Sequence, residues 1–180
     1  MKMFLGAALL GVAAWLGFAR RAEAAVDGVT LPPSDPTEAS PALVASGPSA
    51  YAAIARQALG EMGNPFDLPL IMGLMQTESS FNPRAVSSAG AMGLMQVMPF
   101  VAVDRGYDPN AMFDPEQNIR CGIAHLVWTR NYLMPLGKGD LSSVLSAYNG
   151  GVGNVSRGWF NAGYVSKVIA YRDNWAGRVA

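Results

Sequence analysis

The sequence predicts an all-α fold in which no more than a minimal β-hairpin accompanies the helices. Residues 51–180 contain several stretches whose apolar side chains recur at helical spacing, most of them opening on Asp or closing on Gly. No stretch alternates apolar and polar residues over enough positions to indicate a long strand. The chain has 180 residues, 51% of them hydrophobic and 14% charged, which fits one compact domain plus additional sequence.

The helices are predicted from their apolar periods and from the residues at their ends. Asp67, Asp114 and Asp140 are suitable N-caps, and Pro69 falls in a first turn, where its missing N–H costs nothing. "NGGVGN", which follows the fourth helix, lacks the Lys-Ser/Thr of a phosphate loop and is predicted to be a helix stop and a tight turn. The predicted helices cover residues 51–63, 68–79, 114–133, 140–150 and 164–177.

Residues 1–24 are predicted to be a secretory signal or a membrane anchor. A Lys precedes sixteen uncharged, mostly apolar residues, Met3 to Phe18, and a small-residue pattern favours cleavage after Ala24. A retained anchor stays open, because sixteen helical residues span about 24 Å of a hydrocarbon core roughly 30 Å thick. Arg20 and Arg21 also oppose export. Residues 25–50, which are rich in Pro, Ser and Ala, are predicted to be a flexible linker to a folded domain at 51–180.

Charge and cysteine content exclude some functions. The formal net charge is zero, and residues 51–180 carry ten Lys and Arg against nine Asp and Glu without a run of either sign, so nucleic acid is not an expected partner. Cys121 and His125 have the spacing of two metal ligands or of a thiol and its base. Because the chain has no other Cys or His, we expect both in a packed core, with no metal and no cofactor.

Glu78 is the candidate catalytic group. On a helix covering 68–79 it lies in the middle of the apolar stripe formed by Leu70, Ile71, Leu74 and Met75. It also lies at the C-terminal end, where the helix dipole disfavours negative charge. Both effects predict a raised pKa and a carboxyl that can deliver a proton near neutral pH.

A purely structural acid, paired with a cation such as Arg84, is the alternative for Glu78. The loop that follows, "NPRAVSSAGAMG", favours a binding site instead. Its Asn-Pro turn and two glycines let the backbone pass close to another surface, and Gln96 comes next, near the start of another apolar segment. Such a loop is typical of a sugar-binding cleft.

Five sequence blocks resemble the soluble lytic transglycosylase domain, glycoside hydrolase family 23, which has a lysozyme-like fold. In order, they are "ESSFNP", "AVSSAGAMGLMQVMP", "DPEQNIRCGIAHL", "LSAYNGGVGNV" and "YVSKVIAYR", within residues 65–172. The resemblance implies that Glu78 is the catalytic acid, that Tyr164 lies close to it and fixes its orientation, and that Asn118 is a structural tie. The glycan-contacting residues that it implies are Ser87, Gln96, Tyr148 and Asn149.

The remaining contacts are less determined by the sequence. Met92, Met95 and Met98 are either sugar-facing contacts or adaptable core filling, and Met98 is our candidate among them for the cleft. Trp159 and Tyr171 either stack on sugars or pack. The family often carries an acid at the place of Phe160, where this chain has "FNA" instead of "ETR", so a second carboxylate near the cleft is in doubt.

The resemblance implies cleavage of the β-1,4 bond between N-acetylmuramic acid and N-acetylglucosamine in peptidoglycan. Glu78 would protonate the leaving oxygen and then act as base on the C6 hydroxyl, which closes a 1,6-anhydromuramoyl ring. Most glycosidases use two carboxylates. Asp104, Asp108 and Asp114, however, occupy turn or capping contexts, so a single-acid scheme is expected. A true hydrolase of the same bond stays open.

The expected setting is the periplasm or cell envelope, with soluble export or with anchoring to a membrane or virion through residues 3–18. The expected partner is the peptidoglycan strand, together with proteins of a secretion, pilus or virion apparatus that needs local gaps in the wall. A glycan-binding assembly factor with little or no catalysis is the alternative from a different functional class. Intact Glu78, Gln96, Tyr148 and Asn149 favour the enzyme.

Overall fold

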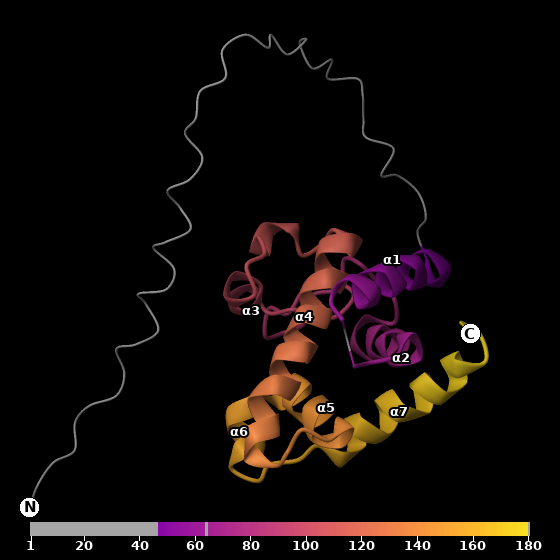
Figure 1. Ribbon diagram of the computed structural model, residues 1–180. Coiled ribbons are helices and arrows are strands. Elements are labelled where there is room, and N and C mark those ends of the chain that lie inside the picture. Colours follow the sequence, from indigo (N-terminus) through magenta and orange to yellow (C-terminus); the bar gives the residue numbers. More distant parts are fainter. Residues whose placement is uncertain (1–46, 64, 180) are drawn as a thin grey trace, which may run out of the picture. The chain divides into compact units, whose positions relative to one another are not determined.

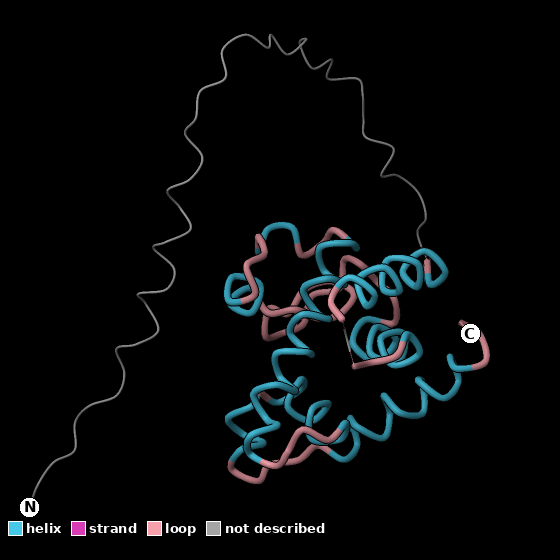
Figure 2. The backbone as a smooth tube through the Cα atoms, in the orientation of Figure 1, coloured by secondary structure: helices cyan, strands magenta, loops and turns pink. Residues whose placement is uncertain are grey.

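The computed structural model describes residues 47–63 and 65–179, and this part of the chain folds into helices joined by loops (Figures 1 and 2). The predicted all-α class is confirmed, since the described residues form no strand. In place of a minimal hairpin there are two isolated antiparallel bridges, Val86 with Met92 and Met92 with Val97. The helices are α1 (Pro48–Glu61), α2 (Leu68–Ser79), α3 (Pro99–Asp104), α4 (Pro115–Leu133), α5 (Leu141–Gly150), α6 (Val152–Ser156) and α7 (Ala162–Ala176), with short 3₁₀ helices η1 (Pro109–Ala111) and η2 (Met134–Leu136).

Three of the helices begin where their Asp residues predict. The carboxylates of Asp67, Asp114 and Asp140 each accept a backbone hydrogen bond in the first turn of α2, α4 and α5, at 2.9, 2.9 and 3.0 Å. Each carboxylate satisfies an N–H that has no partner inside its helix. The predicted ends of α2, α4 and α5 also hold.

The other helices differ from the prediction. α1 begins at Pro48 rather than Tyr51, because a proline fits a first helical position, and residues 48–50 therefore belong to the helix. α7 begins two residues early because Asn161 caps it. α3 and α6 were not predicted, since six and five residues are too few to display an apolar period. "NGGVGN" stops α5 as predicted, but Val152 then starts α6 directly.

α2 lies in the middle of the core and carries the candidate acid at its C-terminal end. Its residues Leu70 to Met75 are all buried. Gly73 permits a close approach of α7: a Cβ built at this position would lie 2.8 Å from the backbone nitrogen of Arg172. The contact between α2 and α7 brings Tyr164, in the first turn of α7, to the end of α2.

Asn118 of α4 holds the loop that follows α2. Its Nδ2 donates to the carbonyls of Met92 and Met112 at 2.9 and 2.8 Å, and its Oδ1 accepts from the amide of Met95 at 2.8 Å. Gly93 lies against this side chain with φ of +75°, and a Cβ there would fall 2.3 Å from Nδ2. Asn118 is therefore the structural tie that the family resemblance led us to expect.

None of the helices within residues 47–63 and 65–179 is long and apolar enough to cross a membrane. The predicted signal or anchor at 1–24 and most of the predicted linker at 25–50 lie outside the described residues.

Candidate active site

Glu78 lies in the last turn of α2 and its side chain is largely buried. The hydroxyl of Tyr164, from α7, donates a hydrogen bond to its Oε1. No ion pair of the described residues includes Glu78, and Arg84, the alternative partner, is exposed. The acid therefore has a neutral donor, and no cation is paired with it.

Burial raises the pKa of the Glu78 carboxyl above its ordinary value. The hydrogen bond from Tyr164 and the positive charge of Lys167 both act in the opposite direction, and burial outweighs them. A raised pKa favours the protonated carboxyl, which is the form that can donate a proton.

Two tyrosines near the acid keep their protons. The hydroxyl of Tyr148, near the end of α5, donates to the carbonyl of Met95 at 2.8 Å. Burial and the charge of Glu78 raise the pKa of both Tyr148 and Tyr164 well above the usual value. Both hydroxyls are therefore hydrogen-bond donors at any physiological pH.

Gln96 reaches the site from the loop between α2 and α3. Its backbone is in the left-handed region, with φ of +48°. Its Nε2 donates to the carbonyls of Ala85 and Gly93 at 3.2 and 3.0 Å. Because the two N–H groups are used inside the loop, the side-chain oxygen is the atom available to a ligand.

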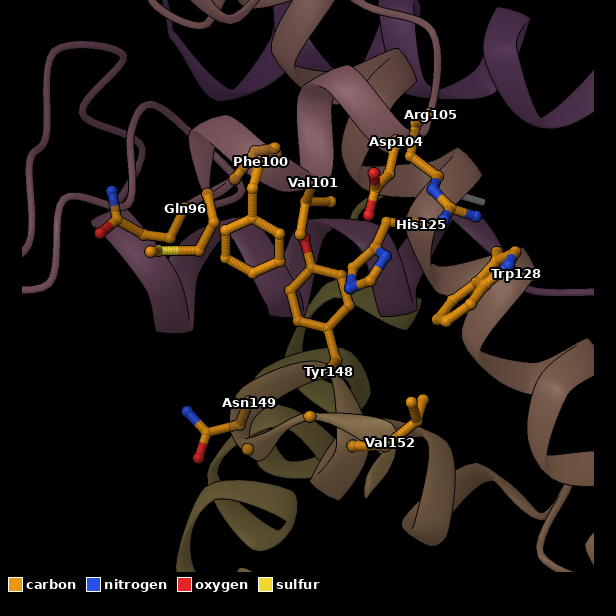
Figure 3. A pocket seen from close by; sticks show the side chains of 15 residues that line it. Gln96, Phe100, Val101, Asp104, Arg105, His125, Trp128, Tyr148, Asn149 and Val152 are labelled. Carbon is orange, nitrogen blue, oxygen red and sulfur yellow. The ribbon is translucent and has the colours of Figure 1, made fainter. Parts of the chain in front are cut away.

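A cavity of about 380 Å³ opens between α3, α4, α5 and the loop before α3 (Figure 3). It brings together four of the sequence-predicted residues, namely Gln96, Met98, Tyr148 and Asn149. Glu78 and Tyr164 do not line it, but the charge of Glu78 acts on Tyr148, which does. The acid is therefore close enough to a tyrosine of the cavity wall to raise the pKa of that tyrosine.

Ser87 does not line this cavity. Its hydroxyl accepts from the amide of Ala91 at 3.0 Å, and its own amide donates to the carbonyl of Ala91 at 2.9 Å. In the described geometry Ser87 closes the turn before Met92. Of the predicted methionines, Met95 is fully buried and Met92 packs against the core, while Met98 is half-buried at the cavity.

His125 was expected in the core together with Cys121, and for His125 this is wrong. Cys121 is buried and burial raises its pKa to about 11, but His125 is half-buried and lines the cavity. Its ring stacks on Trp128 with centroids 5.8 Å apart and lies 5.4 Å from the ring of Tyr148. Burial and the charge of Arg105 lower the pKa of His125 to about 4, so the imidazole is neutral.

Asp104 also departs from its prediction. Asp108 and Asp114 cap η1 and α4, whereas Asp104 ends α3 and lines the cavity. Beside it, Arg105 stacks over Trp128 at 4.2 Å from the ring centroid (Figure 3). The sequence reasoning missed Phe100, Arg105 and Trp128. The spacing of His125, Trp128 and Tyr132 along one face of a helix was the signal that could have found part of this wall.

Trp159 packs close to the cavity without lining it. A Cβ at Gly150, which does line the cavity, would fall 2.0 Å from the Trp159 ring, so this glycine makes room for the indole. The ring is nevertheless 43% exposed, and Phe160 beside it is 48% exposed. Tyr171 lies farther along α7, beneath the ammonium group of Lys167 at 6.0 Å.

Comparison with known proteins gives a consistent set of relatives. The family model described as the transglycosylase SLT domain matches residues 60–167. A membrane-bound lytic murein transglycosylase C of Mannheimia succiniciproducens is 42% identical over 119 residues, which are 59% of this chain and 33% of the relative. The protein of the same name from Salmonella typhimurium is 41% identical over 123 residues, 62% of this chain and 34% of the relative. The chain thus spans about a third of the length of these relatives.

Two solved structures resemble this fold. The 70 kDa soluble lytic transglycosylase of Escherichia coli is 27% identical with a TM-score of 0.59, over 71% of this chain and 24% of that one. The lytic transglycosylase Slt of Pseudomonas aeruginosa, an inactive mutant, has a TM-score of 0.61 at 23% identity, over 73% of this chain and 25% of that one. At this identity the second likeness concerns the fold alone.

Proposed function

Because the chain belongs to the transglycosylase SLT family, we propose that it is a peptidoglycan lytic transglycosylase. It would cleave the β-1,4 bond between N-acetylmuramic acid and N-acetylglucosamine and leave 1,6-anhydromuramoyl ends. The observation that carries the proposal is Glu78, a largely buried acid whose hydrogen-bond partner is the hydroxyl of Tyr164.

In the first step Glu78 donates its proton to the oxygen of the glycosidic bond. The raised pKa of Glu78 favours the protonated form that this step needs. As the bond breaks, the carboxylate that forms keeps the hydrogen bond from Tyr164, which limits the cost of its charge. The acetamido oxygen of the muramoyl sugar supports the positive charge that develops at C1.

In the second step the Glu78 carboxylate takes the proton of the C6 hydroxyl, whose oxygen bonds to C1. Glu78 returns to its protonated state and no water is consumed. An intramolecular hydroxyl held near C1 acts at a high effective concentration, which favours ring closure over hydrolysis. The scheme needs no second carboxylate. The acid of the cavity wall, Asp104, lies with Arg105 and His125 at a different part of the wall from Asn149 (Figure 3).

We propose that the cavity binds the glycan strand through Gln96, Met98, Tyr148 and Asn149. Its lining supports this role, since apolar surfaces such as Met98 and Phe100 stand beside a small number of polar side chains. Ser87 would act on the glycan through the shape of its loop, because its hydroxyl is used in the turn.

We place the protein in the cell envelope. Relatives that are named membrane-bound lytic murein transglycosylase C support this, as do the apolar residues 3–18. From the sequence we also propose that residues 3–18 anchor the protein and that it acts together with a secretion, pilus or virion apparatus.

A second candidate is a glycan-binding assembly factor with little catalysis. Trp159 and Phe160 are both exposed, and the family often carries an acid at the place of Phe160, which favours this candidate. Turbidity of purified peptidoglycan, incubated with the full chain or with its Glu78→Gln variant, separates the two. The proposed enzyme clears the suspension and the variant does not. Binding without clearing by both proteins would support the assembly factor.

A further inference from the structure

Asn161 makes four hydrogen bonds at the start of α7, and its backbone carbonyl accepts one of them, at 3.1 Å, from the amide of Val165. Its Oδ1 accepts from the amide of Tyr164 at 3.1 Å, and its Nδ2 donates to Oδ1 of Asn149 at 2.8 Å. Its own amide donates at 2.8 Å to the hydroxyl of Ser146, a fully buried residue of α5. Asn161 therefore joins the glycan-facing end of α5 to the helix that carries the partner of Glu78.

These contacts allow only one orientation of the side-chain amide of Asn161. The first turn of α7 presents an N–H without a partner in the helix, and a capping side chain must offer it an acceptor. The carbonyl oxygen of the Asn161 amide therefore faces Tyr164, and its NH₂ group faces Asn149. Asn149 in turn must direct its own carbonyl oxygen at Asn161, because the opposite orientation would set two NH₂ groups against each other.

The orientation of Asn149 decides what the cavity offers a ligand. With its oxygen bound to Asn161, Asn149 presents its NH₂ group, and Figure 3 shows the nitrogen on the side of Gln96 and the oxygen on the opposite side. Gln96 has the opposite orientation: its NH₂ group donates to the carbonyls of Ala85 and Gly93, so its side-chain oxygen is the group available to a ligand. The cavity thus has a donor at Asn149 and an acceptor at Gln96.

We propose that Asn161 is a positioning residue that sets the hydrogen-bond polarity of the glycan cleft. By fixing the amide of Asn149 it makes that residue a donor to an acceptor oxygen of the glycan, such as an acetamido carbonyl. The inference rests on the proposed function for the identity of the ligand. Asn161 touches no sugar itself and acts through Asn149.

Two substitutions in the full chain separate this role from simple helix capping. Asn161→Asp and Asn161→Ser keep an oxygen that caps α7 but remove the NH₂ donor. In Asn161→Asp the amide of Asn149 turns to donate to the new carboxylate, so its oxygen faces the cavity. In Asn161→Ser the amide of Asn149 loses its fixed partner. Asn161→Ala, which lacks both groups, is the control for loss of the cap.

The readout is the affinity for an oligomer of four β-1,4-linked N-acetylglucosamine units, measured by calorimetry beside the melting temperature. We expect Asn161→Asp and Asn161→Ser to bind about five- to tenfold more weakly, the loss typical of one hydrogen bond, at an unchanged melting temperature. Asn161→Ala should lose both affinity and thermal stability. Wild-type affinity in the Asp and Ser variants, or no binding by the wild type, overturns the proposal, as does a loss of affinity that only follows the melting temperature.

Nitrogen-15 NMR supplies a second readout that capping alone would not change. The side-chain NH₂ signals of Asn149 should shift when the oligomer is added to the wild type and stay in place in Asn161→Asp. Equal shifts in both proteins contradict the proposal. A wild type that makes no anhydro products, while its Asn161 variants still lose affinity, would remove the proposed function and leave this inference standing.

Discussion

Tyr164 donates a hydrogen bond to Glu78 from 86 residues further along the chain, across the contact between α2 and α7. Two opposing effects act on the carboxyl of Glu78: burial raises its pKa, and the hydrogen bond from the Tyr164 hydroxyl lowers it. A catalytic acid that must later serve as base needs both effects, because the proton has to leave and return within one turnover.

Replacement of Tyr164 by Phe should move the pH profile of the enzyme. Without the hydroxyl the pKa of Glu78 rises further, so the fall of kcat/KM at high pH, where the acid loses its proton, shifts to higher pH. Turnover should also fall more than stability, because the carboxylate loses its orientation. Tyr171→Phe, on the same helix, is the matched control and should leave the profile in place. A Tyr164→Phe profile identical to that of the wild type would contradict the role given to this pair.

Glu78→Gln should abolish wall lysis without loss of stability. A carboxyl whose pKa is raised on folding destabilises the folded state once it ionises, so this cost appears as the pH rises from about 4.5 through the folded pKa. The neutral amide avoids that cost, and the variant should melt at the same or a higher temperature at pH 7. Melting curves at pH 4.5 and 7 test this. A marked drop in melting temperature at pH 7 would mean that ionised Glu78 holds the fold together.

Asn118→Ala should destabilise the protein by about 3 kcal/mol or more, since two carbonyls and one amide, all partly or fully buried, lose their partner. Denaturant unfolding measures the change. The exposed Asn110, whose side chain donates a hydrogen bond to Asp108, is the control, and its Ala variant should lose no more than about 0.5 kcal/mol. Similar losses of unfolding free energy in the two variants would show that Asn118 does not hold the loop in place.

His125 should make the fold sensitive to acid. Its pKa is lowered on folding from 6.5 to about 4. The contribution of the neutral imidazole to the stability of the folded state is therefore fully present above pH 6.5 and is lost as the pH falls toward 4. The loss is on the order of 3 kcal/mol at most. His125→Gln should show a smaller drop in melting temperature between pH 7 and 4 than the wild type. An equal drop in both proteins would show that His125 does not titrate in this range.

The sequence was informative wherever local rules decide the structure. Asp67, Asp114 and Asp140 mark helix starts because an N-cap acts within one turn. The stripe around Glu78 is likewise a property of one helix, and the burial of the acid follows from it. The pairing of Glu78 with Tyr164 came from the family resemblance, since nothing local joins residues so distant in the chain.

The parts that were missed depend on docking between elements. His125 lies on an apolar face of α4 like a core residue, but the cavity left by α3 and α5 partly exposes it. Asp104 looked like a turn residue because α3 is too short to predict. The polarity that Asn161 imposes on Asn149 also requires the packing of α5 against α7.

Mass spectrometry of the soluble products from purified peptidoglycan tests the central claim most directly, with the Glu78→Gln variant beside the wild type. A single acid that closes the C6 hydroxyl onto C1 predicts muropeptides lighter by one water than the corresponding reducing forms, and none from the variant. Reducing ends would contradict the account, because water would then have attacked C1 and a second group would have to activate it.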